Sequence, residues 1–219
     1  MRNSLITYNT PDWLTAFTTG KGVEPEQLGI EQDALVLPRQ THSDHVLWTE
    51  EAGRPEDTDA VITDSPGLCV CVKTADCIPI LLYDARQRIV AAVHAGWRGT
   101  VADIVGKTIK EMNPLNATDI HAIIGPGISL ECFDVGDEVY EIFQKGGFPM
   151  QCIAKRFPAD GGEAWHIDLW EANRWLMEQK GVTDIFVQGI CTRSSMDFYS
   201  ARRETINTGR NYNGIMILR

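Results

Sequence analysis

Two histidines and one cysteine could together hold a metal ion in this chain. His42, Cys77 and His94 each lie in a polar segment at or beyond the end of a predicted strand. Imidazole nitrogen and thiolate sulfur are the donors that zinc prefers, and three protein ligands leave a fourth position for water or substrate. The spacings of 35 and 17 residues match no local zinc motif. The alternative, that both histidines are surface or capping residues, therefore stays open.

A predicted anion site adjoins His94. Gly96 and Gly99 permit tight backbone turns, and an amphipathic helix is predicted to begin at Thr100. The unpaired N–H groups of a helix N-terminus attract phosphate, and Arg98 could add a forked contact to the same anion. An ordinary strand-to-helix turn with a solvated Arg98 is the alternative. The segment lacks the Gly-Lys-Ser/Thr ending of a P-loop, so nucleoside triphosphate hydrolysis has little support.

Other polar residues complete the predicted pocket. Asp76 directly precedes the cysteine, where it could act as an acid or base, orient a ligand, or cap a turn. Arg202 and Arg210 near the C-terminus could bind an anion or form a solvated basic turn. Together with Arg39 they make the predicted pocket locally basic. We assign these three arginines and Gln40 to substrate binding.

Short apolar runs predict the strands that must position these residues. Several runs are apolar on both faces, which indicates strands buried on both sides of a sheet. The predicted strands are Ala34–Leu37, Ala60–Thr63, Leu68–Lys73, Ile78–Tyr83, Ile89–His94, His121–Gly125, Ile185–Ile190 and Ile215–Leu218.

Three segments with apolar residues at helical spacing predict helices. The first runs from Thr100 to Met112, the second begins after Asp134 as N-cap and stops at Gly146, and the third runs from Asp168 to Lys180. Helices thus concentrate after residue 98. This order favours an α+β fold in which residues 1–219 form a single compact layered domain, with mixed β-sheets covered by helices.

Composition and charge exclude several classes of protein. Hydrophobic residues make up 43% and charged residues 23%, as in soluble globular proteins. The net charge of -10 argues against nucleic acid or anionic membranes as partners. No apolar run approaches the ~20 residues that span a membrane, and the first residues lack the apolar core of a secretion signal. We therefore expect a cytoplasmic protein with free thiols, in which Cys69, Cys71 and Cys152 are small buried side chains.

Five motifs, taken together, resemble the YfiH/YlmD family. They follow the family's order from about residue 38 to the C-terminus, and the second and third are long and unusual. The motifs are Gln40-Thr41-His42, Thr74-Ala75-Asp76-Cys77-Ile78-Pro79, His94-Ala95-Gly96-Trp97-Arg98-Gly99, Gly125-Pro126-Gly127-Ile128 and Thr208-Gly209-Arg210.

The resemblance implies both an activity and a metal site. Members of this family are described as purine nucleoside phosphorylases and as polyphenol oxidases with a laccase domain. The family's metal ligands carry over onto His42, Cys77 and His94, because each lies in its matching motif. We expect a zinc-dependent purine nucleoside phosphorylase that takes phosphate with adenosine, inosine or 5'-methylthioadenosine, and that also deaminates adenosine. Asp76, Cys77 and Arg98 are the expected catalytic residues.

Two other enzyme classes compete with this expectation. One is a copper-dependent, laccase-like oxidase of phenols, although five histidines are few for a multicopper site. The other is a hydrolase in which Cys77 is a nucleophile activated by His94, an activity that the resemblance links to editing of peptidoglycan precursors. The sequence leaves the preferred nucleoside, the physiological metal and the oligomeric state open.

Overall fold

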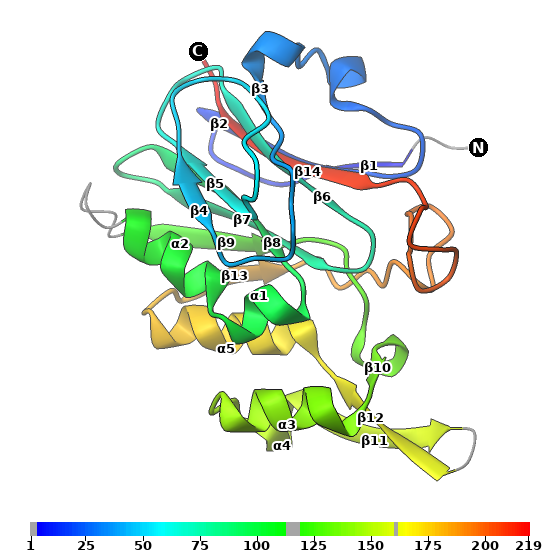
Figure 1. Cartoon of the computed structure of the whole chain (residues 1–219). Helices are drawn as coiled ribbons and strands as arrows, with labels where there is room; N and C mark the ends of the chain where they lie inside the picture. Colours follow the sequence, from blue (N-terminus) through cyan, green and yellow to red (C-terminus); the bar gives the residue numbers. More distant parts are fainter. Residues whose placement is uncertain (1–3, 113–118, 160–161) are drawn as a thin grey trace.

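Two β-sheets packed face to face form the centre of the protein (Figure 1). The computed structural model describes residues 4–112, 119–159 and 162–219. The six-stranded sheet has the order β13 (Asp184–Val187), β9 (Ile120–Ile124), β7 (Ile78–Asp84), β8 (Ile89–Ala95), β5 (Ala60–Thr63) and β4 (Val46–Trp48). The five-stranded sheet has the order β1 (Leu5–Thr7), β2 (Leu14–Thr19), β14 (Asn211–Ile217), β6 (Cys69–Thr74) and β3 (Leu35–Val36).

Alternation along the central strands creates two apolar cores. On β7, Ile80 and Leu82 face the core beneath the helices, whereas Leu81 and Tyr83 face the core between the two sheets. Successive side chains of a strand point to opposite faces, so a run that is apolar throughout fits a strand covered on both sides. Both sheets are mixed. In the six-stranded sheet β7 pairs antiparallel with β8 and β9, whereas β13 pairs parallel with β9. In the five-stranded sheet β14 pairs antiparallel with β6, whereas β3 pairs parallel with β6.

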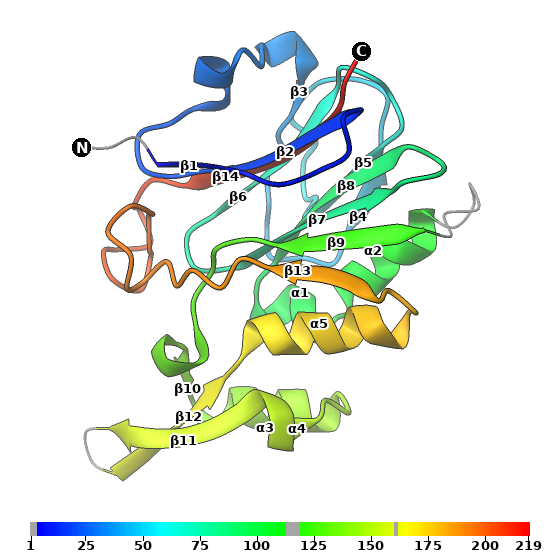
Figure 2. The same cartoon turned by 180° about the vertical axis from the view of Figure 1, so that it is seen from behind.

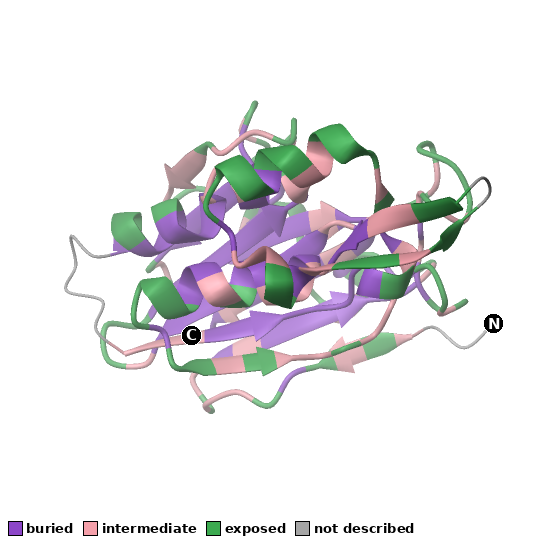
Figure 3. Ribbon diagram, turned by 90° about the horizontal axis from the view of Figure 1, so that it is seen from below, coloured by how far each residue is buried: buried purple, intermediate pink, exposed green. Residues whose placement is uncertain are grey.

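Helices cover the outer face of the six-stranded sheet (Figures 1 and 2). Seen from below, their outward surfaces are exposed whereas the strands behind them are buried (Figure 3). These helices are α1 (Trp97–Val101), α2 (Ile104–Met112) and α5 (Leu169–Gln179). Asp168 caps α5 by accepting a hydrogen bond from the Glu171 backbone N–H at 3.0 Å, as predicted from the sequence.

A smaller three-stranded sheet extends below these helices (Figure 1). Its strands, in spatial order, are β10 (Asp134–Val135), β12 (Gly162–Ile167) and β11 (Ala154–Ala159). The short helices α3 (Asp137–Lys145) and α4 (Met150–Ile153) pack against it. Single 3-10 turns occupy Pro25–Leu28, Gln32–Ala34 and Leu130–Cys132.

The α+β fold and all eight predicted strands are confirmed. The single helix predicted over Thr100–Met112 is wrong, because Asp103 takes a left-handed φ of 56° between α1 and α2. The N-cap predicted at Asp134 is wrong as well, since that residue pairs in β10 and Gly136 is the N-cap of α3. That residues 1–219 form one domain stays a prediction.

The six cysteines are free. Cys69 and Cys71 are buried as predicted, whereas the prediction for Cys152 is wrong. Cys152 lies in the four-residue helix α4, where Ile153 takes the buried position and the thiol is exposed. Among the described residues, none of the helices has the length and apolar character needed to cross a membrane.

Candidate active site

A cavity of about 620 Å³ opens where β6, β7 and β8 meet the loop between β13 and β14. Its lining combines metal-binding, basic and apolar side chains. The lining residues are Arg39, Gln40, His42, Lys73, Ala75, Asp76, Cys77, His94, Ile128, Phe133, Ala201, Arg202, Ile206 and Arg210. We call residues 192–210 the wall loop, because the last four of these residues belong to it.

The structure brings His42, Cys77 and His94 together in the lining of this cavity. One potential ligand atom from each lies within 4.8 Å of the other two. His94 is buried on β8, Cys77 is half-buried between β6 and β7, and His42 is exposed in the loop after β3. The two imidazole rings meet edge to face, with centroids 4.9 Å apart.

The donor set fits a metal ion such as zinc. Burial raises the pKa of the Cys77 thiol, but the positive charge of His94 and hydrogen bonds from both imidazoles outweigh burial and lower the pKa to about 6. A thiolate is the form that binds zinc. The packing around the donor set is close, because a Cβ at Gly96 would lie 3.1 Å from Cys77 Sγ and 3.2 Å from His42 Cδ2 and would displace these side chains.

Asp59 orients the two histidines. Its fully buried carboxylate lies 2.7 Å from His94 Nδ1, which leaves Nε2 of that ring to face a metal. The same carboxylate accepts hydrogen bonds from the backbone N–H groups of Thr41, His42 and Ser43 at 3.1, 3.1 and 2.8 Å. These bonds hold His42 at a left-handed φ of 62°. Asp59 therefore supports both the strand and the loop that supply the imidazoles.

Asp76 connects the cavity floor to the wall loop. Its Oδ1 accepts a hydrogen bond from Thr192 Oγ1 at 2.6 Å, and its Oδ2 accepts one from the backbone N–H of Arg202 at 2.7 Å. Asp76 also has a left-handed φ of 92° directly before Cys77. Because both carboxylate oxygens are engaged, the geometry favours an orienting role over proton transfer.

The basic residues of the cavity differ in how they are neutralised. Arg39 forms an ion pair with Glu56 at 3.2 Å, and Arg202 forms one with Asp134 at 2.5 Å. Within the described part of the chain, Lys73 and Arg210 have no carboxylate within ion-pair distance. Burial and the positive charges of Arg54 and Arg210 lower the pKa of Lys73, so this corner of the cavity concentrates positive charge. It is suited to an anion.

Of the residues predicted from the sequence to form the site, only Arg98 does not line the cavity. Helix α1 begins at Trp97 instead of Thr100, and the exposed Arg98 guanidinium lies over the Trp97 ring, 4.3 Å from its centroid. Gln40 lines the cavity, but its amide is occupied by the Lys73 backbone. Gln40 Nε2 donates to Lys73 O, and Oε1 accepts from Lys73 N, both at 2.8 Å.

Sequence reasoning assigned no role to Lys73, Phe133 and Ile206, which line the cavity, or to Asp59, which supports the metal-binding histidines. Lys73 is the only charged residue of the strand β6, next to its end at Thr74, and this position could have marked it. Phe133 lies in the turn that follows the Gly125–Ile128 motif, where an aromatic side chain by itself indicates no particular role. Asp59 carried only the weak signal of a carboxylate directly before an apolar strand.

The comparisons with known proteins agree with this geometry. Residues 23–218 match the family described as multi-copper polyphenol oxidoreductase laccase. A protein of Bacteroides thetaiotaomicron named purine nucleoside phosphorylase is 46% identical over 201 residues, covering 84% of this chain and 74% of that protein. A protein of an unknown prokaryote named adenosine deaminase RL5 is 44% identical over 204 residues, covering 86% and 77%. The crystal structure of the hypothetical protein YfiH of Bacillus licheniformis has a TM-score of 0.84 and 26% identity, covering 95% and 94% of the two chains.

Proposed function

The chain belongs to the multi-copper polyphenol oxidoreductase laccase family, which includes YfiH, and on this premise we propose that it is a zinc-dependent purine nucleoside phosphorylase. One observation carries the proposal: a His-Cys-His donor set shares one cavity with Lys73 and Arg210, for which the described residues offer no carboxylate within ion-pair distance. The name of the Bacteroides relative supports it. Adenosine, inosine and 5'-methylthioadenosine are the proposed nucleosides, with phosphate as the second substrate.

The two sides of the cavity suit the two substrates. Ile128, Phe133 and Ile206 offer apolar surface against which a purine can pack. Lys73 lies on the basic side and would bind phosphate through charge-assisted hydrogen bonds. Arg210, whose guanidinium donates to the carbonyl oxygens of Ile206, Thr208 and Gly209, adds positive charge beside it. A nucleoside held between the two sides presents its ribose to the phosphate.

Phosphorolysis then needs little covalent chemistry from the protein. A phosphate oxygen forms a bond to C1' of the ribose, the bond from C1' to the purine nitrogen breaks, and the purine leaves with that electron pair and takes up a proton. His42, Cys77 and His94 would hold the zinc, which supplies Lewis-acid chemistry when bound. The side chains of the chain itself bind and orient both substrates, and proximity of this kind accounts for a large part of many rate enhancements.

The proposal is tested by incubating the purified protein with adenosine, with and without phosphate, and separating the products. Phosphate-dependent release of adenine supports it. Formation of inosine without phosphate would instead support adenosine deamination, a second candidate favoured by the relative named adenosine deaminase.

Oxidation of phenols by copper is the competing candidate, and the description of the family favours it. Among the residues that the structure describes, one group of three metal-binding side chains of this type is found. A multicopper oxidase needs several copper ions, so this donor set favours a single-metal enzyme. Metal analysis of protein purified without added copper, paired with a phenol oxidation assay, separates the two.

Replacing Lys73 with methionine is expected to raise the KM for phosphate by about tenfold and to leave the KM for adenosine within about twofold. The change removes a positive charge from the basic side of the cavity and keeps the apolar length of the side chain. Steady-state kinetics with each substrate varied in turn measures both values. Lys110→Met removes the same charge from helix α2, outside the cavity, and is the matched control. Equal KM values for phosphate in the Lys73 variant and the wild type would contradict this assignment.

A further inference from the structure

The wall loop has an internal scaffold of side chains that do not line the cavity. The loop makes up most of the connection between β13 and β14, residues 188–210, which are all described and contain no helix or strand. Beyond one isolated bridge, in which the Thr192 backbone N–H donates to Gly127 O at 2.9 Å, the loop must satisfy and order its backbone through other contacts. The loop nevertheless contributes Ala201, Arg202, Ile206 and Arg210 to the cavity lining. The contacts that order it therefore shape the cavity.

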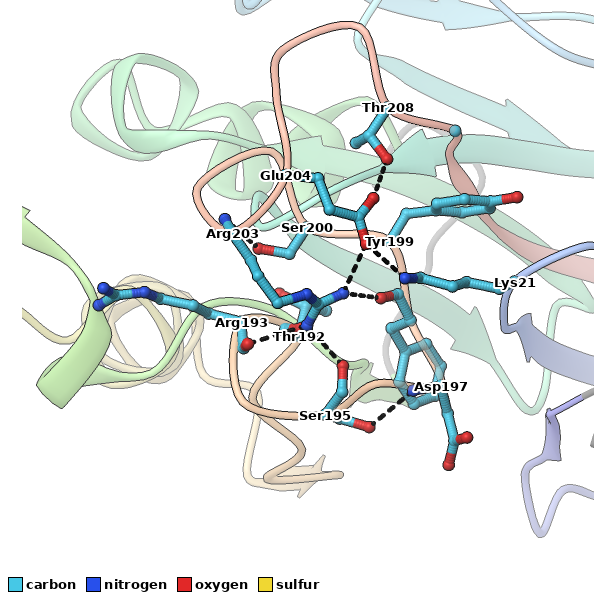
Figure 4. Close-up of polar contacts among 12 residues, drawn as sticks. Lys21, Thr192, Arg193, Ser195, Asp197, Tyr199, Ser200, Arg203, Glu204 and Thr208 are labelled. Atoms are coloured by element: carbon cyan, nitrogen blue, oxygen red, sulfur yellow. Dashed lines mark hydrogen bonds and ion pairs between the residues drawn. The ribbon is translucent and has the colours of Figure 1, made fainter. Parts of the chain in front are cut away.

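Arg203 lies at the centre of this scaffold (Figure 4). Its Nη1 donates to the carbonyl oxygens of Thr192, Arg193 and Ser195 at 2.7, 2.8 and 2.7 Å. Its Nη2 donates to the carbonyl oxygen of Phe198 at 2.5 Å. Four carbonyl groups of the first half of the loop thus converge on one planar guanidinium, whose rigid fork of donors suits such a set. Arg203 is not itself a lining residue of the cavity.

Glu204 fastens the same scaffold to the second half of the loop and to the end of β2. Its carboxylate accepts a hydrogen bond from Arg203 Nη2 at 2.9 Å and further bonds from Lys21 Nζ and Thr208 Oγ1 (Figure 4). The Lys21 backbone N–H also donates to Asp197 O at 2.8 Å. The loop is therefore anchored to the rest of the fold on its outer side.

The scaffold connects directly to the candidate active site through Asp76. The hydroxyl of Thr192 donates to Asp76 Oδ1, and the carbonyl oxygen of the same threonine accepts from Arg203. The backbone N–H of Arg202, the residue before Arg203, donates to Asp76 Oδ2. Both bonds that attach the loop to Asp76 thus begin at residues held by, or bonded to, Arg203. A displaced guanidinium would release both ends of this attachment beside Cys77.

From these contacts we infer that Arg203 is a positioning residue for substrate binding, acting through the wall loop and its two hydrogen bonds to Asp76. The inference rests on the proposed function for its kinetic consequence, but the ordering of the loop does not depend on that function. Arg203 sets the separation between Arg202, Ile206 and Arg210 on the wall and the donor set on the cavity floor. It touches neither substrate nor metal.

The test is the variant Arg203→Lys. An ammonium group places three donors on one atom and cannot span the four carbonyl groups and Glu204. We expect the KM for adenosine to rise by about tenfold, with kcat changed by less than about threefold and the metal content unchanged. Hydrogen exchange of the amides in residues 197–210 should accelerate by about tenfold, whereas exchange in β7 and β8 stays as in the wild type.

Arg193→Lys is the matched control, because Arg193 lies in the same loop and binds Arg203 only through its backbone carbonyl. Its exposed side chain lies outside the cavity and makes one long hydrogen bond, to Cys132 O at 3.4 Å, which a lysine can also make. The Arg193→Lys variant should change neither the KM for adenosine nor the hydrogen exchange of residues 197–210. Glu204→Gln keeps the shape of the side chain and weakens the outer anchor, so it should accelerate the same amides if Arg203→Lys does not fold. Wild-type exchange in the wall loop of the variants would overturn the inference. Equal losses in kcat, metal content and global protection would also overturn it, since they indicate general destabilisation. If the wild-type protein shows no phosphorolysis, the proposed function fails, and the exchange measurement still decides whether Arg203 orders the loop.

Discussion

The variant Cys77→Ser is expected to lose its bound metal and at least about a thousandfold in the rate of phosphorolysis. A serine hydroxyl stays protonated near neutral pH, whereas the Cys77 thiol has a pKa of about 6 because His94 and His42 favour its thiolate. Removing one of the three donors leaves two imidazoles, and two ligands hold zinc weakly. Metal analysis after gel filtration measures the first loss, and steady-state kinetics with adenosine at saturating phosphate measures the second.

Two control variants separate this effect from a general sensitivity to loss of a thiol. Cys132→Ser and Cys152→Ser change a half-buried and an exposed cysteine that do not line the cavity. Both should retain metal and rate. A Cys77→Ser protein that keeps its metal but loses all activity would favour the competing hydrolase, in which Cys77 is the nucleophile. One that keeps both metal and activity would contradict the proposed site.

The variant Asp59→Asn should weaken zinc binding by about 10- to 100-fold although it touches no metal. The Asp59 carboxylate accepts four hydrogen bonds from the backbone and side chains of residues 41–43 and faces His94 Nδ1 at 2.7 Å. An asparagine of the same shape must turn its NH₂ group toward some of these donors, which leaves buried donors facing each other. The loop that carries His42 and the ring of His94 then lose their common support.

Competition with a chelator of known zinc affinity measures this change. Asp57→Asn is the matched control, because Asp57 lies in the same segment and is exposed, and its carboxylate contacts Thr41 Oγ1 and His45. We expect Asp57→Asn to bind zinc within about threefold of the wild type. Equal zinc affinity in Asp59→Asn and the wild type would show that Asp59 does not orient the ligands.

The central strands were predictable because their physical signal is local. Runs such as Ile78–Tyr83 and Ile89–Val93 are apolar throughout, and only a strand covered on both faces buries such a run. The strands that were missed carry little of this signal. β2 has the sequence Leu-Thr-Ala-Phe-Thr-Thr, and the β11–β12 hairpin is largely polar and partly exposed, so their pairing depends on partners distant in the sequence.

The candidate site shows the same division. Residue types and sequence motifs identified His42, Cys77 and His94, and the structure places their donor atoms within 4.8 Å of one another. Asp59 could not be found in this way, because it reaches His94 only through the antiparallel register that aligns Ala60 with Val93. Arg98 shows the opposite failure. Its type suits an anion site, but its direction depends on where helix α1 begins and on packing against Trp97.

The reaction proposed for this cavity is phosphorolysis, in which phosphate bonds to the ribose of a purine nucleoside and the purine leaves. Incubating the zinc-loaded protein with adenosine and phosphate tests it most directly, with adenine measured by chromatography and the phosphorus species measured by ³¹P NMR. We predict equimolar adenine and ribose 1-phosphate, and neither product from protein in which Cys77 is serine. Consumption of adenosine with no new phosphorus species, whether it yields inosine or free ribose, would contradict the account.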